Sequence, residues 1–355
     1  MFTLFGKNVG GDEGIQKGTR RMEAKWWQSC GDGKIKCLLC PRECIIDADR
    51  TGFCGVRKNI DGKLQSLVYG KPITVHVDPI EKKPLYHFLP GAAVFSIGTV
   101  GCNLGCIFCQ NWDISRASFL ERKTVSLTPE MAVRSALGHD CSAIAFTYNE
   151  PTIFGEYVYD VSSLARKAGL KTIMVTNGYT RKEAIEEIYP LIDAANIDLK
   201  SFSDKFYRSH CQARLEPVLD AIMNIQKSGT FIELTNLLIP GLNDTDAEIE
   251  RLSDWIVKNL GEDVPLHFSA FHPGYKLNRL QPTPKLTLDR ARHIAMDVGV
   301  RYVYEGNVAA TIENDTYCPG CQSLLIERRG FSVIRNEIRD GKCSCGMKIP
   351  IVESV

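Results

Sequence analysis

Apolar runs with the length of β-strands alternate with amphipathic runs with the length of α-helices from Ala92 to Tyr304, and this alternation limits the possible folds more than any other feature. Strands are expected at residues 92–99, 141–147, 171–176, 194–199, 231–239, 266–271 and 302–304. Helices are expected from Thr128 onward and at residues 151–167, 181–189, 214–228, 245–259 and 288–298. Such alternation implies an α/β fold with a parallel sheet and right-handed crossovers. Six or seven units are too few for a closed eight-fold barrel and suit a partial one.

Segments of different character flank the barrel pattern, so the sequence predicts three units. Residues 1–90 are expected to form an N-terminal arm, one short helix near Trp26–Trp27 and a small cysteine-rich subdomain. Residues 91–311 carry the barrel, and residues 312–355 form a separate short module. Ligands of parallel sheets and barrels bind at the carboxyl ends of the strands, so the loops that follow the strands are where chemistry is expected.

The charge and hydropathy of the chain exclude some classes of partner. The 43 lysines and arginines nearly balance the 42 acidic residues, so a net charge of +1 gives no electrostatic reason to expect a nucleic acid or an anionic membrane as partner. No apolar run approaches the ~20 residues of a membrane helix, and residues 1–7 are too short and too weakly apolar for a signal peptide. We therefore expect a cytoplasmic protein, in which the 14 cysteines stay reduced and bind metal where they cluster.

Eleven of these cysteines fall into three groups, which we call the N-terminal, central and C-terminal cysteines. The groups are, in that order, Cys37, Cys40, Cys44 and Cys54; Cys102, Cys106 and Cys109; and Cys318, Cys321, Cys343 and Cys345. Cys30, Cys141 and Cys211 stand alone, and we expect them to be buried thiols or ordinary surface residues.

The central cysteines lie directly after the first barrel strand with the spacing Cys-x3-Cys-x2-Cys, and no fourth cysteine is near them in the sequence. Three thiolates on one short loop can ligate three irons of a 4Fe-4S cubane and leave the fourth iron open. Such an iron can chelate the amino and carboxylate groups of the methionine part of S-adenosylmethionine. One electron could then split the sulfonium carbon–sulfur bond and give a 5′-deoxyadenosyl radical. A zinc knuckle or three incidental thiols are the alternatives.

Four stretches around these loops resemble the pyruvate formate-lyase activating enzyme group of the radical S-adenosylmethionine (radical SAM) superfamily. They are Gly101–Asn111, Phe146–Thr152, Val175–Gly178 and Asp198–Lys200. Residues 37–41, 52–57 and 78–88 extend the resemblance beyond the barrel. With them, nearly the whole chain resembles the AmmeMemoRadiSam system radical enzymes. The resemblance implies a partial (β/α)6 TIM-like barrel, S-adenosylmethionine as cosubstrate and a catalytic 4Fe-4S cluster held by the central cysteines.

The resemblance also implies which residues hold the cosubstrate. Phe108, just before the last central cysteine, is expected near the adenine. Tyr148, Asn149 and Glu150 stand where relatives carry a Gly-Gly-Glu that contacts the methionyl amino group, although Tyr148 and Asn149 replace both glycines. A carbonyl and a carboxylate can bind an ammonium group, while a helix that starts at Pro151 would explain the same stretch.

Three further loops are expected to face the cosubstrate by the same resemblance. Thr176 and Asn177 end the third strand, and Asp198 and Lys200 lie two residues apart at the end of the fourth, on one face of it. The Asp198–Lys200 pair suits a zwitterionic ligand, with a solvated salt bridge as the alternative. His272 matches a histidine that contacts the cosubstrate in the activating enzymes, with a simple turn residue as the alternative.

The two flanking cysteine groups are expected to bind metal. The C-terminal cysteines bracket a hairpin-like stretch and suit a closed tetrahedral zinc site, although only one residue separates Cys343 from Cys345. The N-terminal cysteines suit zinc or an auxiliary 4Fe-4S cluster, and their spacing does not decide between the two. Residues 78–87 are expected to line a substrate entrance or to form a connecting segment with solvated charges.

These features favour an oxygen-sensitive radical enzyme that abstracts hydrogen from an unidentified protein or small-molecule substrate. An electron donor such as flavodoxin or ferredoxin would reduce the cluster. One alternative is an activating enzyme that installs a glycyl radical on a partner protein. Another, from a different class, is a non-catalytic metal protein that carries electrons or binds nucleic acid. The near-neutral charge argues against nucleic acid, and an electron carrier would use four thiolates for each cluster.

Overall fold

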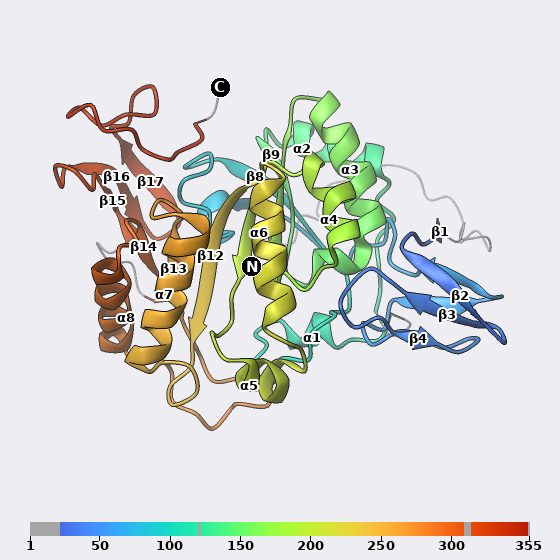
Figure 1. Cartoon of the computed structure of the whole chain (residues 1–355). Helices are drawn as coiled ribbons and strands as arrows, with labels where there is room; N and C mark the ends of the chain where they lie inside the picture. Colours follow the sequence, from blue (N-terminus) through green and yellow to red (C-terminus); the bar gives the residue numbers. More distant parts are fainter. Residues whose placement is uncertain (1–21, 120–121, 309–313, 354–355) are drawn as a thin grey trace.

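An eight-stranded sheet forms the centre of the protein (Figure 1). The computed structural model describes residues 22–119, 122–308 and 314–353. The strands follow each other across the sheet in sequence order. β7 (Thr74–Pro79) is antiparallel to β8 (Ala93–Gly98), and the six pairings from β8 to β14 (Val303–Gly306) are parallel. Because β7 and β14 stand at opposite ends of this order, the sheet is an open, partial barrel, and the α/β fold expected from the sequence is confirmed.

The remaining parallel strands and their helices lie within a few residues of the predicted positions. The strands are β9 (Ala143–Phe146), β10 (Lys171–Thr176), β11 (Ala194–Asp198), β12 (Phe231–Leu238) and β13 (Leu266–Ala270). The helices are α2 (Pro129–Gly138), α3 (Gly155–Lys167), α4 (Lys182–Ile188), α6 (Glu216–Lys227), α7 (Asp246–Leu260) and α8 (Lys285–Val298). α8 begins earlier than residue 288 because Pro284 stands ahead of its first turn, where no helical hydrogen bond is lost.

The helices cover the outer face of the sheet, and apolar side chains fill the space between the two layers (Figure 1). Ile97, Phe146 and Leu234 of the strands and Val158 and Ile222 of the helices are fully buried there. Burial of each such side chain contributes ~1.5–3 kcal/mol. Two short helices, α1 (Trp112–Ser115) and α5 (Asp204–Phe206), and a π-helical turn at Tyr207–Cys211 follow β8 and β11. Within the described ranges, none of the helices has the length and apolarity of a membrane span.

The segment between β7 and β8 closes the amino end of the barrel. Pro79 at the end of β7 pairs with Ala93 at the start of β8, so the connecting residues lie beside the first residues of the parallel strands. Ile80, Leu85 and Phe88 are buried in one apolar cluster with the first residues of β8, β9 and β11. The barrel is therefore plugged at the end opposite to the loops that follow the strands.

Asp78, Glu81 and Lys83 are buried while Lys82 is exposed, so the predicted run of solvated charges is wrong for three of these four residues. Lys83 Nζ lies 2.6 Å from Asp78 Oδ2, and both side chains are less than a tenth exposed. Burial raises the pKa of Asp78, but the charge of Lys83 together with hydrogen bonds from Lys82, Lys83 and Tyr148 outweighs burial and holds the pKa well below its usual range. Glu81 accepts a hydrogen bond from Gly91 N at 2.8 Å. The sequence shows these residues as a charged run because only the tertiary structure turns them inward.

A small sheet built from the N-terminal cysteine segment stands on one flank of the barrel (Figure 1). Its strands are β2 (Trp27–Gly31), β3 (Lys34–Cys37) and β4 (Ile45–Ile46), and β1 (Met22–Glu23), β6 (Lys63–Ser66) and β5 (Arg57–Ile60) form a second sheet. The short helix predicted near Trp26–Trp27 is wrong. Asp32 and Gly33 both take positive φ, which builds the tight turn of a β-hairpin instead. The predicted arm at residues 1–21 lies outside the described residues.

A buried ion pair fastens this N-terminal segment to the barrel. Arg57 Nη1 lies 2.9 Å and 3.0 Å from the two carboxylate oxygens of Glu156 on α3. Arg57 Nη2 also donates to Lys25 O at 2.6 Å. Both side chains of the pair are almost completely buried, so the loss of either partner would leave an uncompensated buried charge.

The C-terminal module stands on the opposite flank (Figure 1) and packs on the barrel plug. Its strands are β15 (Thr316–Tyr317), β16 (Leu324–Arg329) and β17 (Ser332–Asn336). Arg328 is 1% exposed and donates to Tyr86 O at 2.8 Å. Leu89 N donates to Val352 O at 2.7 Å. The module therefore covers the closed end of the barrel and leaves the loops after the strands uncovered.

A buried polar network joins the module, the plug and the barrel strands. Glu233 of β12 accepts from His87 N at 2.7 Å, and its other oxygen lies 2.6 Å from His267 Nε2. His87 Nδ1 lies 2.9 Å from Pro350 O, which can only accept, so Nδ1 carries the proton. Nε2 then accepts from Tyr304 OH at 2.6 Å. Burial lowers the pKa of His87 to about 4, so the imidazole is neutral at pH 7.

We predict that His87 makes stability depend on pH. Its pKa is about 6.5 in the unfolded chain and about 4 when folded, so between these values only the unfolded state binds the proton. The free energy of unfolding should fall by up to about 3 kcal/mol as the pH drops from 6.5 to 4. A His87→Asn variant still donates to Pro350 O but cannot titrate, so urea unfolding should show a flatter pH dependence. Equal slopes in the two proteins would contradict the prediction.

Candidate functional site

The central cysteine loop follows β8 at the open end of the barrel, and two glycines set its path. Gly101 has a φ of +92°, and a Cβ on it would lie 2.4 Å from Cys54 O. A Cβ on Gly105 would lie 2.4 Å from Gln212 Oε1. At Gly101 the loop passes directly against the backbone of the N-terminal cysteine segment, where only glycine fits. At Gly105 it passes against the side chain of Gln212, which follows the π-helical turn.

Cys102, Cys106 and Cys109 converge at this loop, and all are buried or half-buried. Burial raises the pKa of Cys102 and of Cys109, and the neighbouring Cys106 adds to both shifts. A bound cation reverses that effect, because it stabilises the thiolate. Within the described ranges, only the C-terminal cysteines gather three or more potential ligand atoms within 4.8 Å. The central sulfurs are more widely spread, which fits a cubane whose thiolates each bind a different iron.

Asn149 ties the central loop to the end of β9. Its Oδ1 accepts from Thr99 N at 3.0 Å, and its Nδ2 donates to Thr99 Oγ1 and to Gly101 O, each at 3.0 Å. Asn149, which the sequence predicts to contact the cosubstrate, therefore uses its carboxamide to hold Gly101, the residue directly before Cys102. Asn111 adds a further tie, because its Nδ2 donates to Tyr148 O at 2.8 Å.

Glu150 joins the loops that follow β9 and β10. Its Oε1 accepts from Thr152 N at 2.9 Å and from Thr176 Oγ1 at 2.8 Å, while Oε2 accepts from Asn177 N at 2.8 Å. The side chain is almost fully buried, and burial raises the pKa of Glu150. Glu150 also caps a 3-10 turn that starts at Pro151 and leads into α3, so the helix-start alternative from the sequence is confirmed.

Asn177 points its carboxamide at the first central cysteine. Its Nδ2 donates to Asn103 Oδ1 at 2.9 Å and lies 3.7 Å from Cys102 Sγ. Leu104 N lies 3.3 Å from the same sulfur. Hydrogen bonds to a ligating sulfur change the reduction potential of an iron–sulfur cluster, so Asn177 and Leu104 would affect a cluster only if Cys102 ligates it.

Asp198 and Lys200 lie side by side at the end of β11. Lys200 Nζ is 3.0 Å from Asp198 Oδ2 and 6.0 Å from the centre of the Phe108 ring. The lysine side chain is 15% exposed and the aspartate side chain 35%, so the salt bridge is partly solvated. Burial alone would lower the pKa of Lys200, but Asp198 and Cys106 outweigh it and raise the pKa. The buried Phe108 ring packs 5.6 Å from the ring of Phe206.

Tyr148 and His272 both contact other parts of the barrel. Tyr148 has a φ of +71°, and its hydroxyl donates to Asp78 inside the barrel. Lys83 Nζ lies 4.6 Å from the centre of the Tyr148 ring, so this side chain extends toward the plug. His272 is exposed beyond β13, and its Nε2 lies 2.9 Å from Asn307 O.

Cys211 was not predicted at the site, yet the π-helical turn brings it against the central loop. Gly105 N donates to Cys211 O at 2.8 Å. Cys211 is completely buried, and a hydrogen bond with its thiol is the main cause that raises the pKa of Cys106. Cys211 stands alone in the sequence, so no spacing pattern could have placed it beside a residue over a hundred positions earlier.

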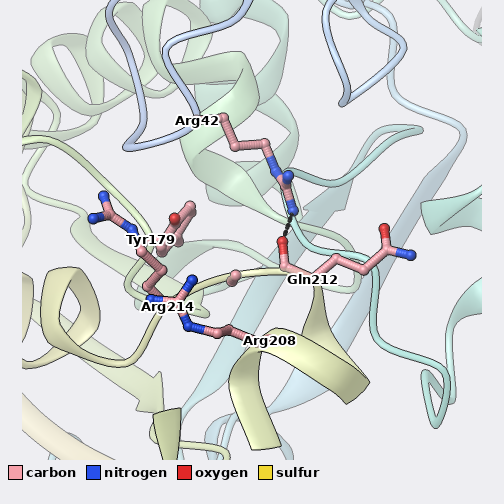
Figure 2. Close-up of a pocket in the computed structure, with 6 residues that line it drawn as sticks. Arg42, Tyr179, Arg208, Gln212 and Arg214 are labelled. Carbon is pink, nitrogen blue, oxygen red and sulfur yellow. Dashed lines mark hydrogen bonds between the residues drawn. The ribbon is translucent and has the colours of Figure 1, made fainter. Parts of the chain in front are cut away.

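A positively charged pocket of about 350 Å³ opens beside the central loop (Figure 2). It is lined by Arg42, Tyr179, Arg208, Gln212, Ala213 and Arg214. Arg42 donates to Asn103 O and to Gln212 O, so it connects the N-terminal segment, the central loop and the π-helical turn. Arg208 pairs with Asp204, and Arg214 is exposed. We call this feature the arginine pocket.

The C-terminal cysteines gather at one point of the small module. Cys318 Sγ lies 3.7 Å from Cys345 Sγ, and Cys321 Sγ lies 3.6 Å from Cys343 Sγ. Four thiolates that bind one tetrahedral ion at ~2.3 Å stand about 3.8 Å apart. The single residue between Cys343 and Cys345 therefore does not prevent a metal site, and the four sulfurs can hold an ion.

Comparisons with known proteins find relatives of this chain. The sequence model of the Radical SAM superfamily matches residues 96–256. The chain is 43% identical over 333 residues to the uncharacterised protein MJ0808 of Methanocaldococcus jannaschii, covering 93% of this chain and 99% of that protein. It is 22% identical to the pyruvate formate-lyase 1-activating enzyme of Escherichia coli, covering 58% of this chain and 89% of that enzyme. A radical SAM methyltransferase from Sphaerobacter thermophilus is similar in structure with a TM-score of 0.49 at 17% identity, covering 62% and 68% of the two chains.

The family match begins within β8 and ends within α7, so it contains the central cysteines and the loops that follow β9, β10 and β11. These are the loops in which Glu150, Asn177 and Lys200 lie. Radical SAM proteins use a 4Fe-4S cluster and S-adenosylmethionine, and the spread of the three central sulfurs fits such a cluster. The chain belongs to the radical SAM superfamily of enzymes.

Proposed function

We propose that the enzyme cleaves S-adenosylmethionine reductively at the central cysteine loop and abstracts hydrogen from a substrate. The bound cluster and cosubstrate would supply the electron and the 5′-deoxyadenosyl radical. The observation that carries this proposal is the convergence of Cys102, Cys106 and Cys109 on one loop at the open end of the barrel. The amino end is plugged, so the open end is where a substrate can enter.

The residues around the loop have separate tasks in this proposal. Lys200 and Asp198 present opposite charges to the carboxylate and the ammonium of the methionyl group. Phe108 offers an apolar surface to the adenine. Asn149 and Glu150 act as positioning residues, because their hydrogen bonds hold the loops that follow β8 and β10.

A protein is the substrate class that we favour, with radical installation on a glycine of a partner protein as one form of the reaction. Relatives named activating enzymes support this choice, since a pyruvate formate-lyase activating enzyme by its name acts on another enzyme. A small-molecule substrate is the other possibility that the site geometry permits. A non-catalytic electron carrier fits less well, because its cluster would need a fourth thiolate ligand. The additional cysteine near the loop, Cys211, is hydrogen-bonded to Cys106, whereas a fourth ligand would stand apart from the other three sulfurs.

A Cys102→Ser variant should lose S-adenosylmethionine cleavage. The serine removes one of three iron ligands, so 5′-deoxyadenosine should fall to the background level after anaerobic reconstitution and reduction with dithionite. A Cys30→Ser variant is the matched control, because Cys30 is an exposed thiol on β2. Wild-type protein that makes no 5′-deoxyadenosine, or a Cys102→Ser protein that makes as much as the control, would refute the proposal.

We also propose that an acidic one-electron donor, such as flavodoxin or ferredoxin, docks at the arginine pocket. The pocket touches the central loop through Arg42, so a donor bound there would be close to the cluster. Guanidinium groups pair well with carboxylates, and opposite charges speed the encounter of two proteins.

An Arg208→Gln, Arg214→Gln double variant should slow reduction by flavodoxin about 10-fold at low salt. The same variant should be reduced by dithionite at the wild-type rate, because dithionite needs no docking site. Arg134→Gln, which removes an exposed arginine on α2, is the matched control. Stopped-flow absorbance of the cluster would give the rates. Equal flavodoxin rates in the double variant and the control would rule out docking at this pocket.

For the C-terminal cysteines we propose a structural zinc ion. Their sulfur separations of 3.6 Å and 3.7 Å support a single tetrahedral ion over a cubane. The module has a small core, so metal binding would contribute much of its folding free energy.

A Cys345→Ser variant should lose about one zinc per chain. Because structural zinc contributes folding free energy, thermal unfolding should also start at a lower temperature. Elemental analysis and calorimetry would measure the two effects, with Cys30→Ser as the control. Iron in place of zinc at this site, shown by iron that disappears with Cys345, would overturn the assignment.

A further inference from the structure

The N-terminal cysteines surround a closed cavity next to the radical SAM loop. Cys37, Cys40, Cys44 and Cys54 all line it, together with Arg57 and Asn103. All four cysteines are free thiols. Apolar side chains of Leu39, Ile46 and Ile153 complete much of the wall. Four thiols around one cavity are the donor set of a metal centre, for which zinc and a 4Fe-4S cluster are the candidates.

The spread of the sulfurs distinguishes the two candidates. A zinc ion draws four thiolates to about 3.8 Å from each other, and two pairs of the C-terminal sulfurs stand at 3.6 Å and 3.7 Å. In the described part of the chain, no three of the N-terminal sulfurs gather within 4.8 Å. They share this wider spacing with the central cysteines. The sulfur separations of the C-terminal cysteines are those expected around a single ion, and the sulfurs of the N-terminal cysteines are further apart than that.

A residue that lines this site carries an unpaired hydrogen-bond donor. Arg57 is 1% exposed and lines the cavity, yet its Nε has no hydrogen-bond partner among the described residues. Its other nitrogens bind Glu156 and Lys25 O. A buried N–H without a partner costs about 1–3 kcal/mol. The sulfur atoms of a bound cluster are acceptors that would satisfy it.

The cavity and the radical SAM loop share a wall. Asn103 lines the cavity and directly follows Cys102. Cys54 O lies 2.4 Å from the position that a Cβ on Gly101 would take. Two metal centres on either side of this contact would be near neighbours, whereas the C-terminal cysteines lie on the opposite flank of the barrel (Figure 1).

We propose that the N-terminal cysteines hold an auxiliary 4Fe-4S cluster, ligated by all four thiolates and placed beside the radical SAM cluster. It would accept one electron from the external one-electron donor and pass that electron to the neighbouring cluster, so each transfer oxidises one centre and reduces the next. A donor docked at the arginine pocket, as proposed above, would lie at Arg42, two residues after Cys40. The occupant of the cavity follows from its own residues, while the relay rests on the proposed function.

The test compares the iron and zinc contents of three anaerobically reconstituted proteins. Wild type should contain about eight irons and about one zinc per chain. A Cys102→Ala, Cys106→Ala, Cys109→Ala variant should keep about four irons, because the auxiliary cluster remains. A Cys40→Ser, Cys44→Ser variant should likewise keep about four. Circular dichroism of all three checks the fold, and a Cys30→Ser control should match wild type.

Electron paramagnetic resonance gives a second readout. In the variant that lacks the central cysteines, the reduced protein should show a cluster signal that S-adenosylmethionine does not change, because all four irons have protein ligands. A folded central variant without iron and with about two zinc ions per chain would overturn the proposal. If this variant retains its cluster while wild type makes no 5′-deoxyadenosine, the auxiliary cluster stands and only the proposed function falls.

Discussion

The hydrogen bonds of two buried side chains at the end of β9 hold the whole site together. Asn149 binds the backbone on both sides of Val100, just ahead of Cys102, while Glu150 binds the backbone and hydroxyl groups at the end of β10. Each buried group left without its partner would cost about 1–3 kcal/mol. The relative position of the central cysteines and Asn177 therefore depends on side chains that need not touch the cosubstrate.

The barrel keeps its two ends chemically distinct. At the amino end, the plug, Glu233, His87 and the C-terminal module form a closed network of buried polar groups. At the carboxyl end, Asp198 and Lys200 form a charge pair next to the central sulfurs. A closed, well-packed base lets the loops of the open end carry glycines, positive φ angles and buried charges without loss of the fold.

The three cysteine groups differ in geometry although their donor atoms are the same. The C-terminal sulfurs stand at the separation of ligands to one ion, while the central and N-terminal sulfurs stand further apart. The C-terminal pairs at 3.7 Å and 3.6 Å each join a cysteine before the hairpin to one after it, Cys318 with Cys345 and Cys321 with Cys343. The central cysteines all lie on one loop, which packs against Cys54, Gln212 and Cys211.

The sequence by itself determined the order and the type of the barrel elements, because apolar periodicity is a local property that survives in almost any tertiary context. It also determined the three groups of cysteines and the radical SAM motif, since ligands on one loop are close whatever the rest of the chain does. It gave a wrong helix near Trp26–Trp27, where an Asp-Gly turn makes a hairpin.

Only the tertiary structure decided how distant residues meet. It turned the charges of Asp78, Glu81 and Lys83 into the barrel, placed Cys211 beside Cys106, and gathered Arg42, Arg208 and Arg214 around one pocket. It also set the spacing of the N-terminal sulfurs and their shared wall with the central loop. These contacts depend on the folding of segments far apart in the chain, and no local pattern records which side chains such folding brings together.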